Sequence, residues 1–89
     1  MKAIIQRTGK ITSLGGNGKK NPFVSDIAAQ YGYRYIDVLD LENYQSIVWE
    51  GIEFNRLYVK DGVLYRFNEW IGDYPYIGIL LEEIGKVEE

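Results

Sequence analysis

The stretch IEFNRLYVKDGVLYRFNEW, residues 52–70, decides the fold of this chain. Asp61-Gly62 lies near its centre, between two runs that are rich in β-branched and aromatic residues. Asp-Gly in this setting is the strongest short-range signal for a β-hairpin with a type I′ turn. A two-residue turn also fixes the register of the two strands. The predicted pairs are Lys60–Val63, Val59–Leu64, Tyr58–Tyr65, Leu57–Arg66, Arg56–Phe67 and Asn55–Asn68.

Both faces of this hairpin carry large apolar side chains. One face presents Phe54, Arg56, Tyr58, Tyr65 and Phe67. The other presents Leu57, Val59, Leu64 and Trp70, beside Asn55, Arg66 and Asn68. Two short helices are too small to cover both faces, and an exposed apolar area above roughly a few hundred Å² usually marks an interface.

We therefore expect a protein interface on the hairpin, because Tyr, Trp and Arg are enriched at interface hot spots. Its predicted residues are Phe54, Arg56, Leu57, Tyr58, Tyr65, Phe67 and Trp70. Arg56 is expected to form a cation–π pair with Phe67 across the hairpin. The alternative is a strongly twisted sheet whose surface the tyrosines tile.

The chain before the hairpin begins with two predicted strands, over residues 2–8 and 10–14, because β-branched residues suit a pleated surface. Gly9 between them indicates a tight turn or a bulge. Residues 15–21 are predicted to form a flexible glycine-rich loop.

A helix is expected over residues 22–31, since Asn21-Pro22 is typical of a helix start and Gly32 of a helix end. Residues 33–41 place apolar groups on alternate sides and predict a strand that is covered on both faces. A turn at 42–45 and a strand over 46–50 follow, with a bend or bulge at Gly51.

After the hairpin, apolar residues recur at helical spacing in Ile77, Leu80, Leu81 and Ile84. They predict a helix that ends at Gly85, followed by a frayed tail over residues 86–89. Residues 1–89 then form one small α+β domain, in which a mainly antiparallel sheet is packed by two short helices.

The composition excludes several classes of protein. The 89 residues include 0 Cys and 0 His, which removes disulfide scaffolds, zinc ribbons, thiol nucleophiles and imidazole catalysis. No run reaches the roughly 18 apolar residues that span a bilayer, and the start has no apolar core of a signal peptide. We expect an intracellular, cytoplasmic protein that does not bind a membrane.

The net charge of −3 is unevenly distributed along the chain. The first 20 residues carry basic groups and no acid, whereas the rest hold 5 basic and 13 acidic groups. The basic residues are Lys2, Arg7, Lys10, Lys19 and Lys20. One interpretation is a positive strand that lies beside a negative strand of the same molecule; the other is a nucleic-acid-binding surface.

Two local patterns resemble nucleotide- or DNA-binding motifs incompletely. The glycine loop before the helix resembles a phosphate cradle, but Ser13 and Lys20 occupy positions where a Walker A loop needs Gly and Ser or Thr. Ala28, Gly32 and Val38 resemble helix-turn-helix spacing. The recognition helix over 34–42 would however present three carboxylates to phosphates.

Without His or Cys, proton transfer would depend on Asp, Glu, Lys or Tyr, and the candidate carboxylate pairs are Asp37/Asp40 and Glu50/Glu53. Neither pair has a recognisable partner pattern, so we expect no catalytic residue, no metal and no cofactor. The sequence favours a small non-catalytic regulator that binds protein and self-associates through the hairpin as a homo-oligomer, a dimer. Its size suits a protein encoded by a virus or mobile element. The alternative is a nucleic-acid-binding module.

Overall fold

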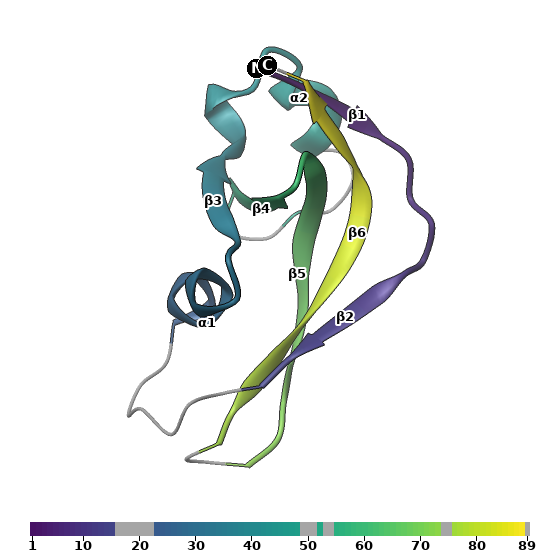
Figure 1. Cartoon of the computed structure of the whole chain (residues 1–89). Helices are drawn as coiled ribbons and strands as arrows, with labels where there is room; N and C mark the ends of the chain where they lie inside the picture. The colour runs from purple at the N-terminus through teal and green to yellow at the C-terminus, as the bar shows by residue number, and fades with distance from the viewer. Residues whose placement is uncertain (16–22, 49–51, 53–54, 74–75, 89) are drawn as a thin grey trace.

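The computed structural model describes residues 1–15, 23–48, 52, 55–73 and 76–88. The N-terminal half holds β1 (Lys2–Ile5), β2 (Ile11–Leu14), α1 (Val24–Gln30), β3 (Arg34–Asp37), a 3₁₀ turn η1 (Val38–Asp40) and α2 (Tyr44–Val48). The C-terminal half holds β4 (Arg56–Lys60), β5 (Val63–Ile71) and β6 (Gly78–Glu88). The strands form one curled antiparallel sheet, a half-barrel with two short helices against it (Figure 1). This confirms the α+β class and the mainly antiparallel sheet.

The hairpin turn is confirmed. Asp61 and Gly62 both have positive φ, 54° and 75°, as a type I′ turn requires. The register is also confirmed next to the turn, where Lys60–Val63, Val59–Leu64 and Tyr58–Tyr65 pair.

The prediction is wrong beyond Tyr58–Tyr65, because the two strands of the hairpin separate there. The ladder between β4 and β5 holds those three pairs only. β4 instead pairs along its length with β3, from Arg34–Val59 to Asp37–Arg56. β5 continues with β6 as far as the pair Ile71–Gly78. The sheet is therefore split between β4 and the distal part of β5.

The central strand β6 replaces the predicted helix over 77–84, and residues 86–88 belong to this strand instead of a frayed tail. β6 pairs with β5 on one side and with β1 and β2 on the other. Ile79 and Leu81 are buried in one core, and Ile84 is buried in the other. A strand that is covered on both faces carries apolar residues on both, so its pattern does not distinguish it from a helix.

Gly85 does not end a helix; it lets the edge strand approach β6. A Cβ atom at Gly85 would overlap the carbonyl oxygen of Ile4. β1 and β2 together line one edge of β6, with Ile5 opposite Gly85 and Ile11 opposite Glu82. Residues 6–10 form an interruption in this edge, where Gly9 has a φ of +75°. Of the two predicted strands, the first is therefore shorter than expected.

Helix α1 ends as predicted, at a glycine. The N–H of Gly32 donates to the Ala29 oxygen and the N–H of Tyr33 to the Ala28 oxygen, both at 3.1 Å. With Gly32 at a φ of +87°, this is a Schellman motif. The predicted helix start at Asn21-Pro22 and most of the glycine loop lie outside the described residues.

The segment from 33 to 48 differs from the prediction in two ways. β3 ends at Asp37, whose carboxylate accepts a hydrogen bond of 3.0 Å from the N–H of Leu39 and so begins η1. Residues 46–48, predicted as a strand, belong to helix α2. The strand β3 also rules out a recognition helix at this position, so the helix-turn-helix interpretation is wrong.

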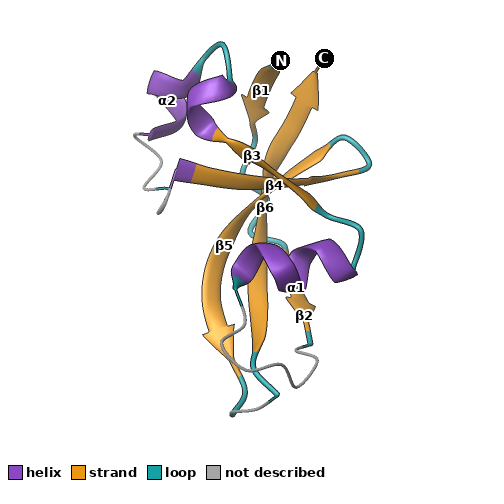
Figure 2. Cartoon of the chain, turned by 90° about the vertical axis from the view of Figure 1, so that its left-hand side faces the viewer, coloured by secondary structure: helices purple, strands orange, loops and turns teal. Residues whose placement is uncertain are grey.

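Two hydrophobic cores lie on opposite faces of the sheet, because neighbouring residues of β4 point to opposite sides. The first lies under η1 and α2 and consists of Ala3, Ile36, Val38, Leu41, Ile47, Leu57, Val59, Leu64 and Ile84. The second lies under α1 and consists of Leu14, Ile27, Ala28, Tyr33, Tyr58, Ile79 and Leu81. Each face of the hairpin thus meets an element of its own chain (Figure 2).

Candidate protein-interaction site

Two of the predicted interface residues are core residues. Leu57 is 0% exposed and Tyr58 is 4% exposed, each in one of the two cores. Tyr65 is half-buried, and its ring meets Tyr33 edge-on, with 5.1 Å between centroids. Burial raises the pKa of both Tyr58 and Tyr65 above the usual value. The central part of the hairpin is therefore not a docking surface, which corrects the prediction; Phe54 lies outside the described residues.

Arg56 is exposed, but its aromatic partner differs from the predicted one. Its guanidinium carbon lies 4.8 Å from the ring centroid of Tyr35, not against Phe67. Tyr35 is 52% exposed and Leu39 is 60% exposed, so the segment over 33–41 is not covered on both faces as expected. The residues of this segment that enter a core are Tyr33, Ile36, Val38 and Leu41.

Phe67 and Trp70 are the predicted residues that the structure brings together at the surface. Their rings meet edge-on, with 5.5 Å between centroids and 64° between planes. Phe67 packs against the core under α1, whereas Trp70 is 47% exposed. Their partners on β6, Leu81 and Ile79, are fully buried in that same core.

A β-bulge makes this aromatic pair possible. The register of β5 against β6 shifts between Phe67 and Glu69, so Phe67 pairs with Leu81 and Glu69 with Leu80. In a regular strand, residues three apart point to opposite faces. The extra residue at the bulge restores Phe67 and Trp70 to one face, the face of α1.

The distal part of β5, residues 66–71, also has a free backbone edge, which we call the hairpin edge. These residues pair with β6 on one side. Within the described part of the chain, their backbone groups form no hydrogen bond on the other side. In Figure 2, this part of β5 lies at the border of the molecule, with β6 on its inner side.

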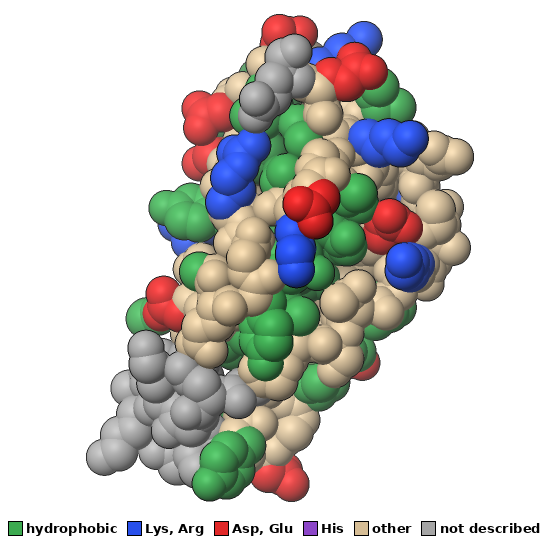
Figure 3. Space-filling model, in the orientation of Figure 1, with side chains coloured by type: hydrophobic (Ala, Val, Ile, Leu, Met, Phe, Trp, Pro, Cys, Tyr) green, Lys and Arg blue, Asp and Glu red, His purple; other side chains and the backbone are tan. Residues whose placement is uncertain are grey.

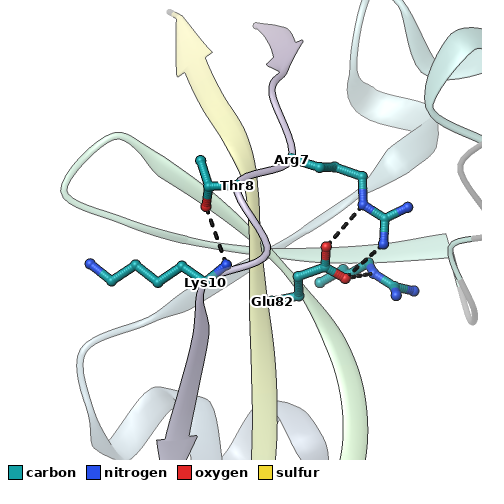
Figure 4. A network of polar contacts seen from close by, with 5 residues as sticks. Arg7, Thr8, Lys10 and Glu82 are labelled. Carbon is teal, nitrogen blue, oxygen red and sulfur yellow. Dashed lines mark hydrogen bonds and ion pairs between the residues drawn. The ribbon is translucent and has the colours of Figure 1, made fainter.

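Two basic residues of the N-terminal segment, Arg7 and Lys2, are placed beside acids of β6. Arg7 donates two hydrogen bonds to the Glu82 carboxylate, of 2.9 Å from Nε and 2.8 Å from Nη2 (Figure 4). Arg66 donates a third, of 2.7 Å, from its Nε. The Glu82 side chain is only 7% exposed, and the hydrogen bonds from Arg7 hold its pKa below the usual value against the opposing effect of burial.

This cluster supports the intramolecular interpretation of the charge asymmetry. Arg7 is engaged by Glu82, and Lys2 lies opposite Glu88 in the ladder. Lys10 is exposed, while Lys19 and Lys20 lie outside the described residues. A basic surface for nucleic acid would have to compete with these neighbouring carboxylates.

Among the described residues, a shallow groove lies at the turn end of the hairpin. Its volume is about 410 Å³, and it is lined by Gly32, Arg34, Val59, Lys60, Asp61, Gly62 and Val87. Lys60 Nζ lies 5.0 Å from the ring centroid of Tyr33. The lining carries charges of both signs, so it selects no class of ion.

Of the two predicted carboxylate pairs, the described chain contains Asp37/Asp40 alone. Asp37 caps η1, and Glu50 and Glu53 lie outside the described residues. The described residues contain no group of three or more potential metal ligands of the His, Cys, Asp or Glu type.

Among the described helices, none has the length and apolar character to cross a membrane.

The surface view shows where apolar side chains remain exposed. On the face of Figure 3, they lie mostly in narrow strips between charged groups, and one apolar group stands beside an acidic one at the lower end of the molecule. The lower end is also the end of the β5–β6 hairpin in Figure 1.

Comparisons with known proteins identify no relative of this chain, because no family model, no curated protein and no solved structure matches it.

Proposed function

We propose that this protein acts by binding protein and that its partner is a second copy of the same chain. The observation that supports this most strongly is Trp70, an almost half-exposed side chain that lies edge-on to Phe67 beside the hairpin edge. Trp is the residue type most enriched at interface hot spots, and a rigid aromatic pair loses little entropy when it is covered. The proposal involves no catalytic residue and no cofactor.

The dimensions of the elements explain why this part of the sheet needs a partner. α1 has 7 residues, which corresponds to roughly 10 Å of helix. β5 has 9 residues, which corresponds to roughly 30 Å of strand. One helix of this length covers the Tyr33–Tyr65 region and leaves the far end of the strand, with Trp70, beyond it.

A second copy is favoured over a strongly charged partner because the hairpin edge has little free charge. Arg66 shares the Glu82 carboxylate with Arg7, so these three side chains together carry a single positive charge. Glu69 is exposed, and its neighbours along the edge, Asn68 and Trp70, are neutral. Two such edges can approach each other without a large repulsion, and the net charge of −3 per chain adds little to it.

Light scattering over a concentration series tests this function. We expect a dimer at micromolar concentration for the natural chain and an association at least about 30-fold weaker for Trp70→Ser, since a hot-spot aromatic contributes ~2 kcal/mol or more. Tyr35→Ser is the matched control, because Tyr35 is exposed to a similar extent, 52% against 47% for Trp70, but lies on β3. Tyr35→Ser should leave the mass unchanged.

Thermal unfolding of each variant establishes that the fold is intact. A natural chain that stays monomeric at every concentration would show the proposal to be wrong. The same conclusion would follow if Tyr35→Ser weakened the dimer as much as Trp70→Ser.

A further inference from the structure

We infer that two copies associate by antiparallel pairing of their hairpin edges, so that β5 of one copy runs beside β5 of the other. The two distal half-sheets would then join into one continuous sheet with the strand order β2-β6-β5-β5-β6-β2. This inference rests on the proposed function and specifies how the second copy is bound.

The backbone of the hairpin edge defines the kind of occupant. Over residues 66–71, the described chain bonds the backbone to β6 alone, which leaves N–H and C=O groups on the other side without a protein partner. Such a row of groups is a template for pairing with an extended strand. β1, β2 and β3 each have four residues, so the hairpin edge is longer than the outer edge of any of these strands.

The other edges are also less suited to strand addition. β1 and β2 are separated by the interruption over residues 6–10; the exposed Lys2 lies on β1 and the exposed Lys10 lies in the interruption. β3 ends at Asp37, where η1 begins. Interruptions, lysines, short length and bulges are features by which natural sheets limit pairing at an edge, and of these the hairpin edge carries only the bulge near Asn68.

The side chains of the hairpin edge are complementary to themselves. Because of the bulge, Phe67 and Trp70 lie on one face, and residues that are directly opposite in neighbouring strands share a face. A two-fold axis between Asn68 and Glu69 therefore places each Phe67 opposite the Trp70 of the other copy. The same axis places each Glu69 opposite a neutral Asn68. A parallel arrangement would place Glu69 against its own copy, which is unfavourable.

The absence of cysteine from the sequence makes this pairing testable by single-cysteine cross-linking. Asn68 and its copy would lie roughly 6 Å apart, within the Cα separation that a disulfide allows. Ile71 and its copy, five residues out of register, would lie roughly 17 Å apart and beyond it. The variants are Asn68→Cys, Glu69→Cys and Ile71→Cys, with Ser13→Cys on the exposed surface of β2 as the control.

Oxidation in a glutathione buffer should link Asn68→Cys and Glu69→Cys at least about tenfold faster than Ile71→Cys and Ser13→Cys, because only the first two approach the axis. Equal rates at positions 68, 69 and 71 would overturn the antiparallel arrangement. Slow linking at all positions, with a dimer still seen by light scattering, would overturn this inference and leave the proposed function standing. A monomer by light scattering would overturn the proposed function itself.

Discussion

The β5–β6 ribbon has two long sides, and they differ in how they are completed. On the β6 side, β1 and β2 pair with the strand, and Arg7 reaches from the interruption between them to the buried Glu82. On the β5 side, residues 66–71 meet no strand in the described part of the chain, and Trp70 is partly exposed. The first side is closed by backbone pairing and by a buried ion pair. The second side presents the same kind of backbone N–H and C=O groups, but no strand of the described chain pairs with them.

The two sides of the ribbon should contribute to different properties: the β6 side to the stability of the monomer and the β5 side to association. Substitutions on the closed side should affect folding, because they remove contacts within one chain. Substitutions on the open side should affect association and leave folding nearly unchanged. Four predictions on monomer stability test this difference, from the largest expected effect to the smallest.

Gly85→Ala should have the largest effect, because its Cβ would overlap the Ile4 carbonyl oxygen and push β1 away from β6. We expect a loss of about 3–5 kcal/mol in the free energy of unfolding, measured with urea. The matched control is Gly9→Ala. Gly9 also has a positive φ, but nothing lies within 4 Å of an added Cβ, so a loss of about 1 kcal/mol is expected. Equal losses at the two positions would show that close packing of β1 against β6 is unimportant.

Glu82→Gln should have an intermediate effect, because it removes a buried charge that accepts hydrogen bonds from Arg7 and Arg66. We expect a loss of about 2 kcal/mol at neutral pH, less than for a fully buried pair since Arg7 is 40% exposed. Glu83→Gln is the control, because the Glu83 carboxylate accepts its hydrogen bond from Thr8 at the exposed surface. Its loss should stay below about 0.5 kcal/mol.

The same residue predicts a dependence on pH. Because the pKa of Glu82 is lower in the folded chain than in the unfolded chain, the unfolded chain binds the proton more readily. The contribution of Glu82 is fully present above its usual value of 4.5 and is lost as the pH falls through its folded pKa. The difference in stability between the natural chain and Glu82→Gln should therefore shrink as the solution is acidified. A difference that stays constant down to about pH 2 would contradict this assignment.

Glu69→Lys should have the smallest effect on the monomer, because Glu69 is exposed on the open side. We expect its free energy of unfolding to change by less than about 0.5 kcal/mol, measured below the concentration at which the chain associates. A loss comparable to that of Glu82→Gln would mean that the two sides of the ribbon do not differ as described.

The candidate site was predictable in its residue types but not in its position. Phe67 and Trp70 stand out in the sequence as aromatic residues of the hairpin, and both lie at the site. That they share a face depends on the bulge near Asn68, for which the sequence shows no glycine or other signal. Leu57 and Tyr58 were equally prominent in the sequence, yet the covering helices bury them. Exposure is decided by which parts of the sheet the helices reach.

The sequence by itself determined the features that depend on neighbouring residues. The Asp61-Gly62 turn follows from the positive φ that both residues accept, and the end of α1 follows from Gly32. Only the tertiary structure decided that residues 78–88 form a strand and residues 44–48 a helix. Short apolar segments have no strong preference of their own, so the partners available on each side select their conformation. For β6 those partners are β1, β2 and β5, which come from both ends of the chain.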